Sequence, residues 1–322
     1  MKIVKVGAGT IFPKITGKSA NIELPAGEYD ENDPEDLRLM QLIPEEDPYY
    51  MFPGIQTLAV LLALQERDNV LLYGTTGVGK TMLLMQLAHK LRLPCTRINC
   101  HVEMGSPELF GYSGLPDPNI PNDNGWKWTS LTLGIQRPGL VIVDEWDTLR
   151  PDVSIGCQRL LEDHQPGLML PDIDRFLPKH EDCIVSATAN TRGLGDSSGL
   201  YVGTGAQNFA QLNRFHLVLE MEPLEKEKMQ SILGRFRVHN KPLKEELVAT
   251  LTNFYGTTLS AFKASGLSAP LSVRMMLHFA RYYEMLGPPA LELVILSKLP
   301  TDEDKVTVKQ LADRAGLIEA TS

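Results

Sequence analysis

The chain reads Gly74-Thr75-Thr76-Gly77-Val78-Gly79-Lys80-Thr81 between two apolar runs, residues 69–73 and 82–88. This order predicts a strand, a glycine-rich turn and a helix, which is the arrangement of the Walker A phosphate-binding loop. Glycines allow backbone conformations that a Cβ would block, so successive N–H groups can turn toward a polyphosphate at the positive end of a helix. Lys80 is then expected to reach the β- and γ-phosphates, and the Thr81 hydroxyl to bind Mg²⁺. These eight residues predict a nucleotide-binding protein.

Composition narrows the class of protein further. The chain has 322 residues, of which 43% are hydrophobic and 22% charged, as in ordinary globular proteins. Its net charge of −9 argues against non-specific nucleic-acid binding. No secretory signal opens the chain, and the longest apolar run, residues 58–64, is too short to span a bilayer. We therefore expect a soluble, cytoplasmic protein without a membrane partner and with nucleic acid an improbable ligand.

The four cysteines show no Cys-x-x-Cys spacing: Cys95, Cys100, Cys157 and Cys183. Buried, reduced thiols are the expected state in a reducing compartment. A metal site that uses Cys95, Cys100 and His101 is the alternative.

The pattern along the chain predicts three regions. Residues 1–45 form an N-terminal acidic arm, because residues 28–47 hold nine acidic residues, one basic residue and several prolines; a solvated arm, a subunit contact and a passive linker all suit it. Residues 46–222 alternate apolar strands with helical segments, which predicts an α/β domain around a parallel sheet. Residues 223–322 are helical throughout and predict a small all-helical lid domain. The expected strands are 69–73, 94–99, 140–143, 183–189 and 215–219, and the expected helices include 55–67, 155–163, 225–236, 243–263, 271–286, 288–298 and 305–315.

Two long connections, residues 102–139 and 167–179, are expected to carry hairpin inserts. The first contains Trp126 and Trp128, which suit either contact with a client protein or packing within the hairpin. The aromatic residues 49–52 ahead of the phosphate loop suit either an adenine cover or plain core.

The apolar tetrad before Asp144 and Glu145 matches the Walker B motif. A buried strand of this kind places both carboxylates at its carboxyl end, beside the phosphate loop. Asp144 is predicted to hold the Mg²⁺ shell, and Glu145 to orient and polarise the attacking water.

Three further polar residues complete a predicted ATPase site. Asn190 follows the next buried strand and is placed to contact the water or the γ-phosphate. Arg214 precedes the last strand and is predicted to reach a neighbouring subunit's nucleotide and stabilise transition-state charge in trans. Arg192 and Arg159 are the rival candidates for that role. Arg274, near the start of a lid helix, is predicted to report the nucleotide state to the lid.

These motifs, in this order, resemble those of an AAA+ ATPase. Closer features resemble the MoxR group and, within it, the ATPase subunit of the cobalt chelatase (CobS type), over roughly residues 45–285. They are EEDPYY at 45–50, DEWDTLRPD at 144–152, QRLLE at 158–162 and, most specifically, ATANTRGLGDSSGLYVGT at 187–204.

The resemblance implies a P-loop ATPase with ATP and Mg²⁺ as ligands, assembled as a homo-oligomeric ring, usually a hexamer, with each nucleotide between subunits. It also implies a partner protein with a von Willebrand A-type domain, as in CobT. The chain departs from the group at three points. The first insert ends Trp126 to Leu131 without the usual Asp-Gly, Asn213 replaces an aspartate before Arg214, and Val273 replaces a proline before Arg274.

Several functions remain compatible with these residues. The leading hypothesis is an Mg²⁺-dependent ATPase that remodels a partner protein and takes part in metal insertion. The alternatives are a MoxR-type maturation chaperone with another client, a nucleotide-gated assembly module with little turnover, and a nucleic-acid motor, which the acidic composition disfavours.

Overall fold

The structure of the chain is a computed structural model that describes residues 1–116, 125–193, 195, 203–205 and 209–318. Two compact units account for it. The first contains Met1–Asp47, Gly54–Gly74 and Lys80–Glu220, and the second contains Pro48–Pro53, Thr75–Gly79 and the chain from Met221 onward. In the described part of the chain, no helix is both long and apolar enough to cross a membrane.

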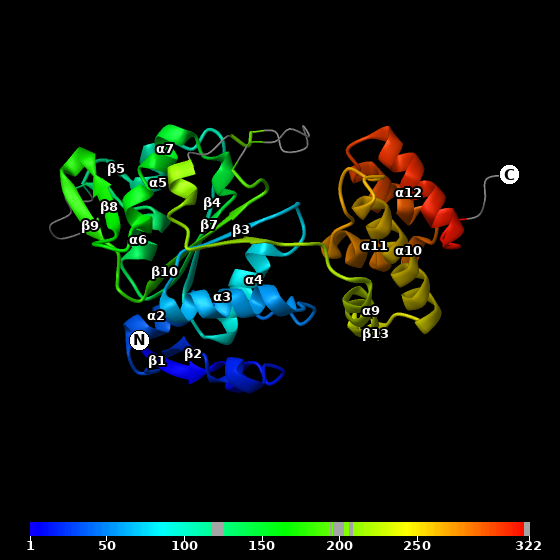
Figure 1. Cartoon of the computed structure of the whole chain (residues 1–322), viewed down its shortest axis with the longest axis horizontal. Coiled ribbons are helices and arrows are strands. Elements are labelled where there is room, and N and C mark those ends of the chain that lie inside the picture. Colours follow the sequence, from blue (N-terminus) through cyan, green and yellow to red (C-terminus); the bar gives the residue numbers. More distant parts are fainter. Residues whose placement is uncertain (117–124, 194, 196–202, 206–208, 319–322) are drawn as a thin grey trace. The chain divides into compact units, whose positions relative to one another are not determined.

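A five-stranded parallel sheet forms the centre of the first unit (Figure 1). Its strands are β3 (Val70–Tyr73), β4 (Cys95–Asn99), β7 (Gly139–Asp144), β10 (Cys183–Ala189) and β11 (Leu217–Glu220). They lie in the order β11-β3-β10-β7-β4, so β3, β10 and β7 are neighbours at the middle of the sheet. The α/β fold class and all five strands are confirmed.

Continuous apolar runs form the central strands because helices cover both faces of the sheet. Every residue of β7 and β10 is buried. Figure 1 shows α3 (Gly54–Glu66) and α4 (Lys80–Lys90) on one face and the shorter helices α5 (Ser106–Phe110), α6 (Ser130–Ile135) and α7 (Pro151–Ile155) on the other. The carboxyl ends of the central strands are thereby left as the polar edge of the unit.

Both long connections contain the predicted hairpins. In the first, β5 (Tyr112–Ser113) pairs with β6 (Trp126–Lys127), and residues 117–124 lie outside the described residues. In the second, β8 (Gly167–Leu170) pairs with β9 (Arg175–Pro178), joined by η4 (Pro171–Ile173). The rings of Trp126 and Trp128 make an edge contact with centroids 6.3 Å apart, and Arg175 lies 5.7 Å from the Trp128 centroid. Packing between the two hairpins therefore uses the tryptophan pair.

The acidic N-terminal segment differs from the solvated arm expected of its composition. β1 (Lys2–Gly7) and β2 (Glu23–Glu28) form an antiparallel pair, with α1 (Ala8–Ile11) and η1 (Gly17–Asn21) between them, and α2 (Pro34–Met40) follows. The backbone N–H of Gly27 donates to the Leu91 carbonyl at 2.9 Å, and that of Cys95 donates to the Leu42 carbonyl at 2.9 Å. The segment is therefore hydrogen-bonded to the α/β core.

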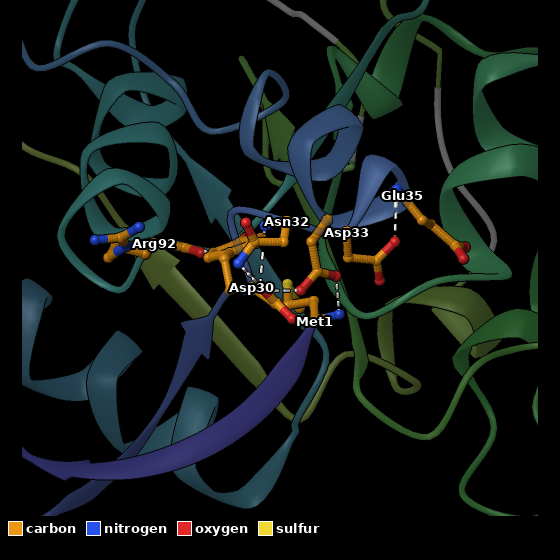
Figure 2. Close-up of polar contacts among 8 residues, drawn as sticks. Met1, Asp30, Asn32, Asp33, Glu35 and Arg92 are labelled. Carbon is orange, nitrogen blue, oxygen red and sulfur yellow. Dashed lines mark hydrogen bonds and ion pairs between the residues drawn. The ribbon is translucent and has the colours of Figure 1, made fainter.

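Many of the acidic side chains in this segment serve local structure. Asp33 accepts a 3.0 Å bond from the Glu35 N–H and so begins α2, while Asp30 accepts from the Asn32 N–H at 2.9 Å (Figure 2). Asp36 pairs with the Met1 ammonium and accepts a 2.8 Å bond from the Asp30 N–H; these contacts lower the pKa of Asp36. The carboxylates of Asp30 and Asp33 therefore cap a turn and a helix within the folded segment.

The second unit is mainly helical. It contains α9 (Lys226–Arg235), α10 (Glu245–Lys263), α11 (Val273–Leu286), the π-helix η5 (Leu291–Ile295), η6 (Leu296–Lys298) and α12 (Asp302–Arg314), with a short hairpin of β12 (Arg237–Val238) and β13 (Lys241–Pro242). Its core includes the fully buried rings of Phe254, Tyr255 and Phe279. The Ser272 and Thr301 hydroxyls accept 3.1 Å bonds from Met275 N–H and Asp304 N–H and begin α11 and α12.

Two predicted helices are broken up. The segment predicted as helix 155–163 is divided between the end of α7 and the 3₁₀ turn η3 (Gln158–Leu161), and a Cβ at Gly156 would come within 2.7 Å of the Phe110 ring. The segment predicted as helix 288–298 is a π-turn followed by a 3₁₀ turn. Helical periodicity of apolar residues does not separate α-helix from these tighter or wider turns.

Candidate active site

The predicted phosphate loop joins β3 to α4. Gly74, Gly77 and Gly79 have φ values of 143°, 85° and 94°, which are unfavourable for residues with a Cβ. Of the predicted phosphate-binding residues, Thr75 to Gly79 group with the second unit, and Gly74, Lys80 and Thr81 with the first. Positive φ values at three glycines give the turn the backbone form that a phosphate cradle needs.

Lys80 is the first residue of α4, and its side chain is directed toward neighbouring strand ends. Its Nζ donates to the Gly74 carbonyl at 2.7 Å and to Asn190 Oδ1 at 3.1 Å, and the residue is only 8% exposed. Burial lowers the pKa of Lys80 to about 8, although the charges of Asp147, Asp144 and Glu145 act to raise it. A buried ammonium of this kind gains a strong partner when a phosphate anion binds.

Asp144 ends β7 and connects three structural elements. Its Oδ1 accepts a 2.7 Å bond from the Thr81 hydroxyl and a short bond from the Thr188 hydroxyl of β10. Its Oδ2 accepts from Arg97 Nε of β4 at 2.8 Å, and the Arg97 Nη2 is 2.5 Å from the same oxygen. The predicted Walker A hydroxyl and Walker B carboxylate are thus in direct contact.

Glu145 has an unusual backbone conformation. Its φ and ψ are 58° and 42°, a left-handed conformation that costs a non-glycine residue about 1–3 kcal/mol. Its N–H donates to the Thr188 hydroxyl at 3.1 Å, and its carbonyl accepts from the Thr148 N–H and hydroxyl at 2.9 and 2.7 Å. The chain turns sharply here, so buried Asp144 is followed by solvent-exposed Glu145. Backbone strain held by this many bonds points to a functional position.

Asn190 lies directly after β10, and the buried carboxylate of Asp147 orders its backbone. Asp147 Oδ2 accepts three bonds: from the Asn190 N–H at 3.0 Å, the Thr191 N–H at 2.8 Å and the Thr191 hydroxyl at 2.9 Å. Asp147 is fully buried. It therefore determines where Asn190 meets Lys80. Part of the sequence run that follows, residues 194 and 196–202, lies outside the described residues.

Arg214 follows α8 (Phe209–Leu212) and precedes β11. Its Nη1 donates to the Ala210 carbonyl at 2.6 Å, and its Nη2 is 3.7 Å from Glu162 Oε1. The next residue, Phe215, is buried and makes an edge contact with the Trp146 ring, with centroids 5.8 Å apart. The contacts with Ala210 and Glu162 therefore hold the Arg214 side chain beside α8.

The two rival arginines have other environments. The Arg159 guanidinium lies over the Phe176 ring, 4.1 Å from its centroid, in the second insert. Arg192 is exposed two residues beyond Asn190, and its charge opposes the rise that burial causes in the pKa of Tyr73. The Arg192 charge therefore acts on Tyr73, the last residue of β3 in the same protomer.

Arg274 is an exposed residue in the first turn of α11. Its charge, with those of Lys298 and Arg281, adds to the burial that lowers the pKa of His278.

The donors present fit Mg²⁺ and a triphosphate. Thr81 and Asp144 offer hard oxygen ligands from elements that meet at the sheet edge, which is the chemistry that Mg²⁺ prefers. The glycine turn and Lys80 offer N–H and ammonium donors to phosphate oxygens. In contrast, the cysteines fit no metal site: burial raises the pKa of Cys95 and Cys157 to about 12, and among the described residues no cluster of three His, Cys, Asp or Glu is placed to hold a metal.

Three residues of the site had no role predicted from the sequence: Arg97, Asp147 and Thr188. Both Arg97 and Thr188 contact Asp144 from neighbouring strands, and the order of the strands in the sheet is not stated by any local pattern. Thr188 is a polar residue near the end of a buried, largely apolar strand, which is a usable signal, whereas β4 is polar at several positions and does not single out Arg97. Asp147 was included only in the motif DEWDTLRPD at 144–152, with no role of its own. Its position three residues after Asp144 is a signal in the sequence that could have identified it.

This site and sheet define an α/β phosphate-loop protein of the AAA+ class. The chain belongs to the AAA domain family of the dynein-related subfamily, whose model matches residues 69–237. The resemblance to AAA+ proteins of the MoxR group and the CobS type is confirmed.

Three individual proteins show the extent of similarity to this chain. The aerobic cobaltochelatase subunit CobS of a Sinorhizobium species is 30% identical over 279 residues, which cover 86% of this chain and 84% of that protein. The denitrification regulatory protein NirQ of Stutzerimonas stutzeri is 27% identical over 159 residues, 45% of this chain and 56% of NirQ. A solved structure of Hsp104 with ATPγS and casein has a TM-score of 0.47 at 16% identity, covering 83% of this chain, which spans about half (49%) of the Hsp104 chain.

Proposed function

We propose that this protein is an Mg²⁺-dependent ATPase that converts ATP and water to ADP and phosphate. The observation that carries the proposal is the hydrogen-bonded set at the ends of β3, β7 and β10, in which Lys80 contacts Asn190 and Thr81 contacts Asp144. Polar groups from the ends of two buried strands converge on the first two residues of α4, an arrangement that suits the binding of a charged ligand.

Each residue then has a defined task. The glycine turn and Lys80 bind the phosphates, and Thr81 and Asp144 hold Mg²⁺, which when bound neutralises charge on the phosphate oxygens. Exposed Glu145 orients the attacking water and takes its proton. Asn190, positioned by Asp147 and Lys80, donates its amide N–H to the water or the γ-phosphate.

A complete site further requires an arginine from a second protomer. The bonds of Arg214 to Ala210 and Glu162 keep its guanidinium with α8, which suits delivery to a neighbouring subunit. We propose a homo-oligomeric ring, a hexamer by family resemblance, with Arg214 acting in trans and Arg274 coupling the nucleotide state to the lid. Arg159 is stacked on Phe176 and is therefore the weaker rival.

The partner is proposed from the relatives. CobS is a subunit of an aerobic cobaltochelatase, and its resemblance to this chain extends over most of both proteins. The proposed work of the ring is therefore to remodel a partner protein with a von Willebrand A-type domain, for metal insertion. The similarity to NirQ, a denitrification regulatory protein, supports a second candidate function: maturation of another client by the same ATPase cycle.

The test of ATPase function is phosphate release from Mg²⁺-ATP, measured across protein concentration. We expect turnover per protomer to rise steeply with assembly, because the site needs a second protomer. No phosphate release at any concentration would favour the nucleotide-gated module. Co-purification with the proteins encoded by neighbouring genes, with and without ATP, separates metal insertion from other clients.

A further inference from the structure

The Asp144 carboxylate has a cationic partner that the proposed mechanism does not use. Arg97 lies on β4, which is an edge strand of the sheet, and directs both Nε and Nη2 at Asp144 Oδ2, at 2.8 and 2.5 Å. The Thr81 and Thr188 hydroxyls occupy Oδ1. A carboxylate offers about four acceptor positions, so protein donors satisfy Asp144 completely.

Binding of Mg²⁺ at Asp144 requires acceptor capacity on that carboxylate. Any ligand water or ion that approaches it must therefore replace one of the protein donors. The Thr188 hydroxyl is held within buried β10, and Thr81 is itself a ligand in the proposed site. Arg97 differs from both because its side chain is 45% exposed and can move into solvent. Arg97 is therefore the donor that can leave at the lowest cost.

We propose that Arg97 is a resident counter-ion of Asp144 that competes with Mg²⁺ and so sets the Mg²⁺ concentration at which nucleotide binds. Three carboxylates, those of Asp144, Glu145 and Asp147, act on Lys80, which supplies one opposing charge. The Arg97 guanidinium adds a second and stabilises the site until metal and nucleotide bring their own charges. This inference rests on the proposed function of the same site.

The experiment measures binding of a fluorescent ATP analogue against Mg²⁺ concentration in an E145Q background, where turnover does not interfere. In Arg97→Gln we expect the Mg²⁺ concentration for half-maximal binding to fall about three- to tenfold, because a competing cation at close range has been removed but is partly screened by solvent. The thermal unfolding midpoint in EDTA is expected to fall in the same variant. Arg97→Lys keeps the charge and is expected to need nearly as much Mg²⁺ as the parent.

Arg67→Gln is the matched control. Arg67 is an arginine of the same unit, 49% exposed, that pairs with Asp182 away from the phosphate loop. We expect its Mg²⁺ requirement to equal that of the parent. An unchanged or raised Mg²⁺ requirement in Arg97→Gln, with nucleotide still bound, would overturn the counter-ion role alone. Failure of the parent protein to bind nucleotide at any Mg²⁺ concentration would instead overturn the proposed function.

Discussion

The carboxyl ends of the central strands and the α8 segment present two kinds of polar organisation. At the strand ends, Lys80 donates to Asn190 and to the Gly74 carbonyl, and Thr81 donates to Asp144. The Asn190 N–H in turn donates to Asp147. Arg214, which follows α8, donates a hydrogen bond to Ala210 of that helix and forms an ion pair with Glu162. The strand-end residues form one hydrogen-bonded network within the chain. The Arg214 guanidinium has its contacts outside that network.

The difference separates binding from catalysis. In the proposed ATPase, the strand-end residues of one protomer bind nucleotide and orient water. In the same proposal, the Arg214 guanidinium stabilises the transition state at the nucleotide of a second copy. Variants of the first region should therefore act on a protomer's own nucleotide, and variants of the second on its neighbour's.

The largest expected effect is that of Glu145→Gln. The amide can neither take the proton from water nor carry charge, so turnover should fall by about 10³-fold while ATP affinity is retained. Phosphate release and equilibrium binding of a fluorescent analogue measure the two quantities. Glu181→Gln, at another exposed carboxylate of the first unit, is the control. Hydrolysis that persists in Glu145→Gln would remove this residue from its role.

Arg214→Ala is expected to come second. Turnover should fall about 10²-fold or more at saturating ATP, because charge on the transferring phosphoryl group loses its cation, whereas nucleotide affinity should change little. Steady-state kcat and KM separate these effects, with exposed Arg38→Ala as the control. Full activity in the Arg214 variant, together with its loss in Arg192→Ala, would transfer the role to Arg192.

Asp147→Asn tests the support of Asn190. The neutral amide weakens three charge-assisted bonds, so we expect kcat to fall about tenfold and the free energy of unfolding by about 1–2 kcal/mol. Denaturant unfolding and steady-state kinetics measure both. Asp152→Asn, which removes a surface carboxylate paired with Arg150, should leave both quantities unchanged. A variant that loses stability but keeps kcat would make Asp147 purely structural.

The smallest expected effect is a pH dependence of binding. The pKa of Lys80 is lowered to about 8, so the unliganded side chain loses its proton as pH rises through that value, and with it the charge that attracts phosphate. ATP affinity should fall about fivefold between pH 8 and pH 9, from the fraction of Lys80 that stays protonated. The free energy of unfolding of the unliganded protein should change in the opposite direction. An unfolded lysine keeps its proton to about pH 10.4, so the unfolded state binds more protons than the folded state, and stability rises with pH between about 8 and 10.4. Affinity that stays constant from pH 7 to pH 10 would contradict this assignment.

Local motifs were sufficient to predict the sheet and the centre of the site. The glycine turn, the apolar tetrad before Asp144 and the strand before Asn190 each carry their own signal, and parallel strands bring their carboxyl ends to one edge. Arg97 and Thr188 escaped prediction because their roles depend on strand order: β4 and β10 flank β7, which no local pattern states. In the N-terminal segment, Asp33 acts as a helix cap and Asp36 as an ion-pair partner, roles that the acidic composition does not specify.

The most direct measurement of the central claim is activity in a mixture of Glu145→Gln and Arg214→Ala protomers. Each variant alone should be nearly inactive. In an equal mixture, an Arg214→Ala protomer keeps its own Glu145 and can receive Arg214 from a Glu145→Gln neighbour. Half of the protomers carry Glu145, and half of their neighbours carry Arg214. An active site needs both, so about a quarter of the parent turnover should return. A mixture as inactive as its components, although it assembles and binds ATP, would contradict an ATPase site shared between protomers.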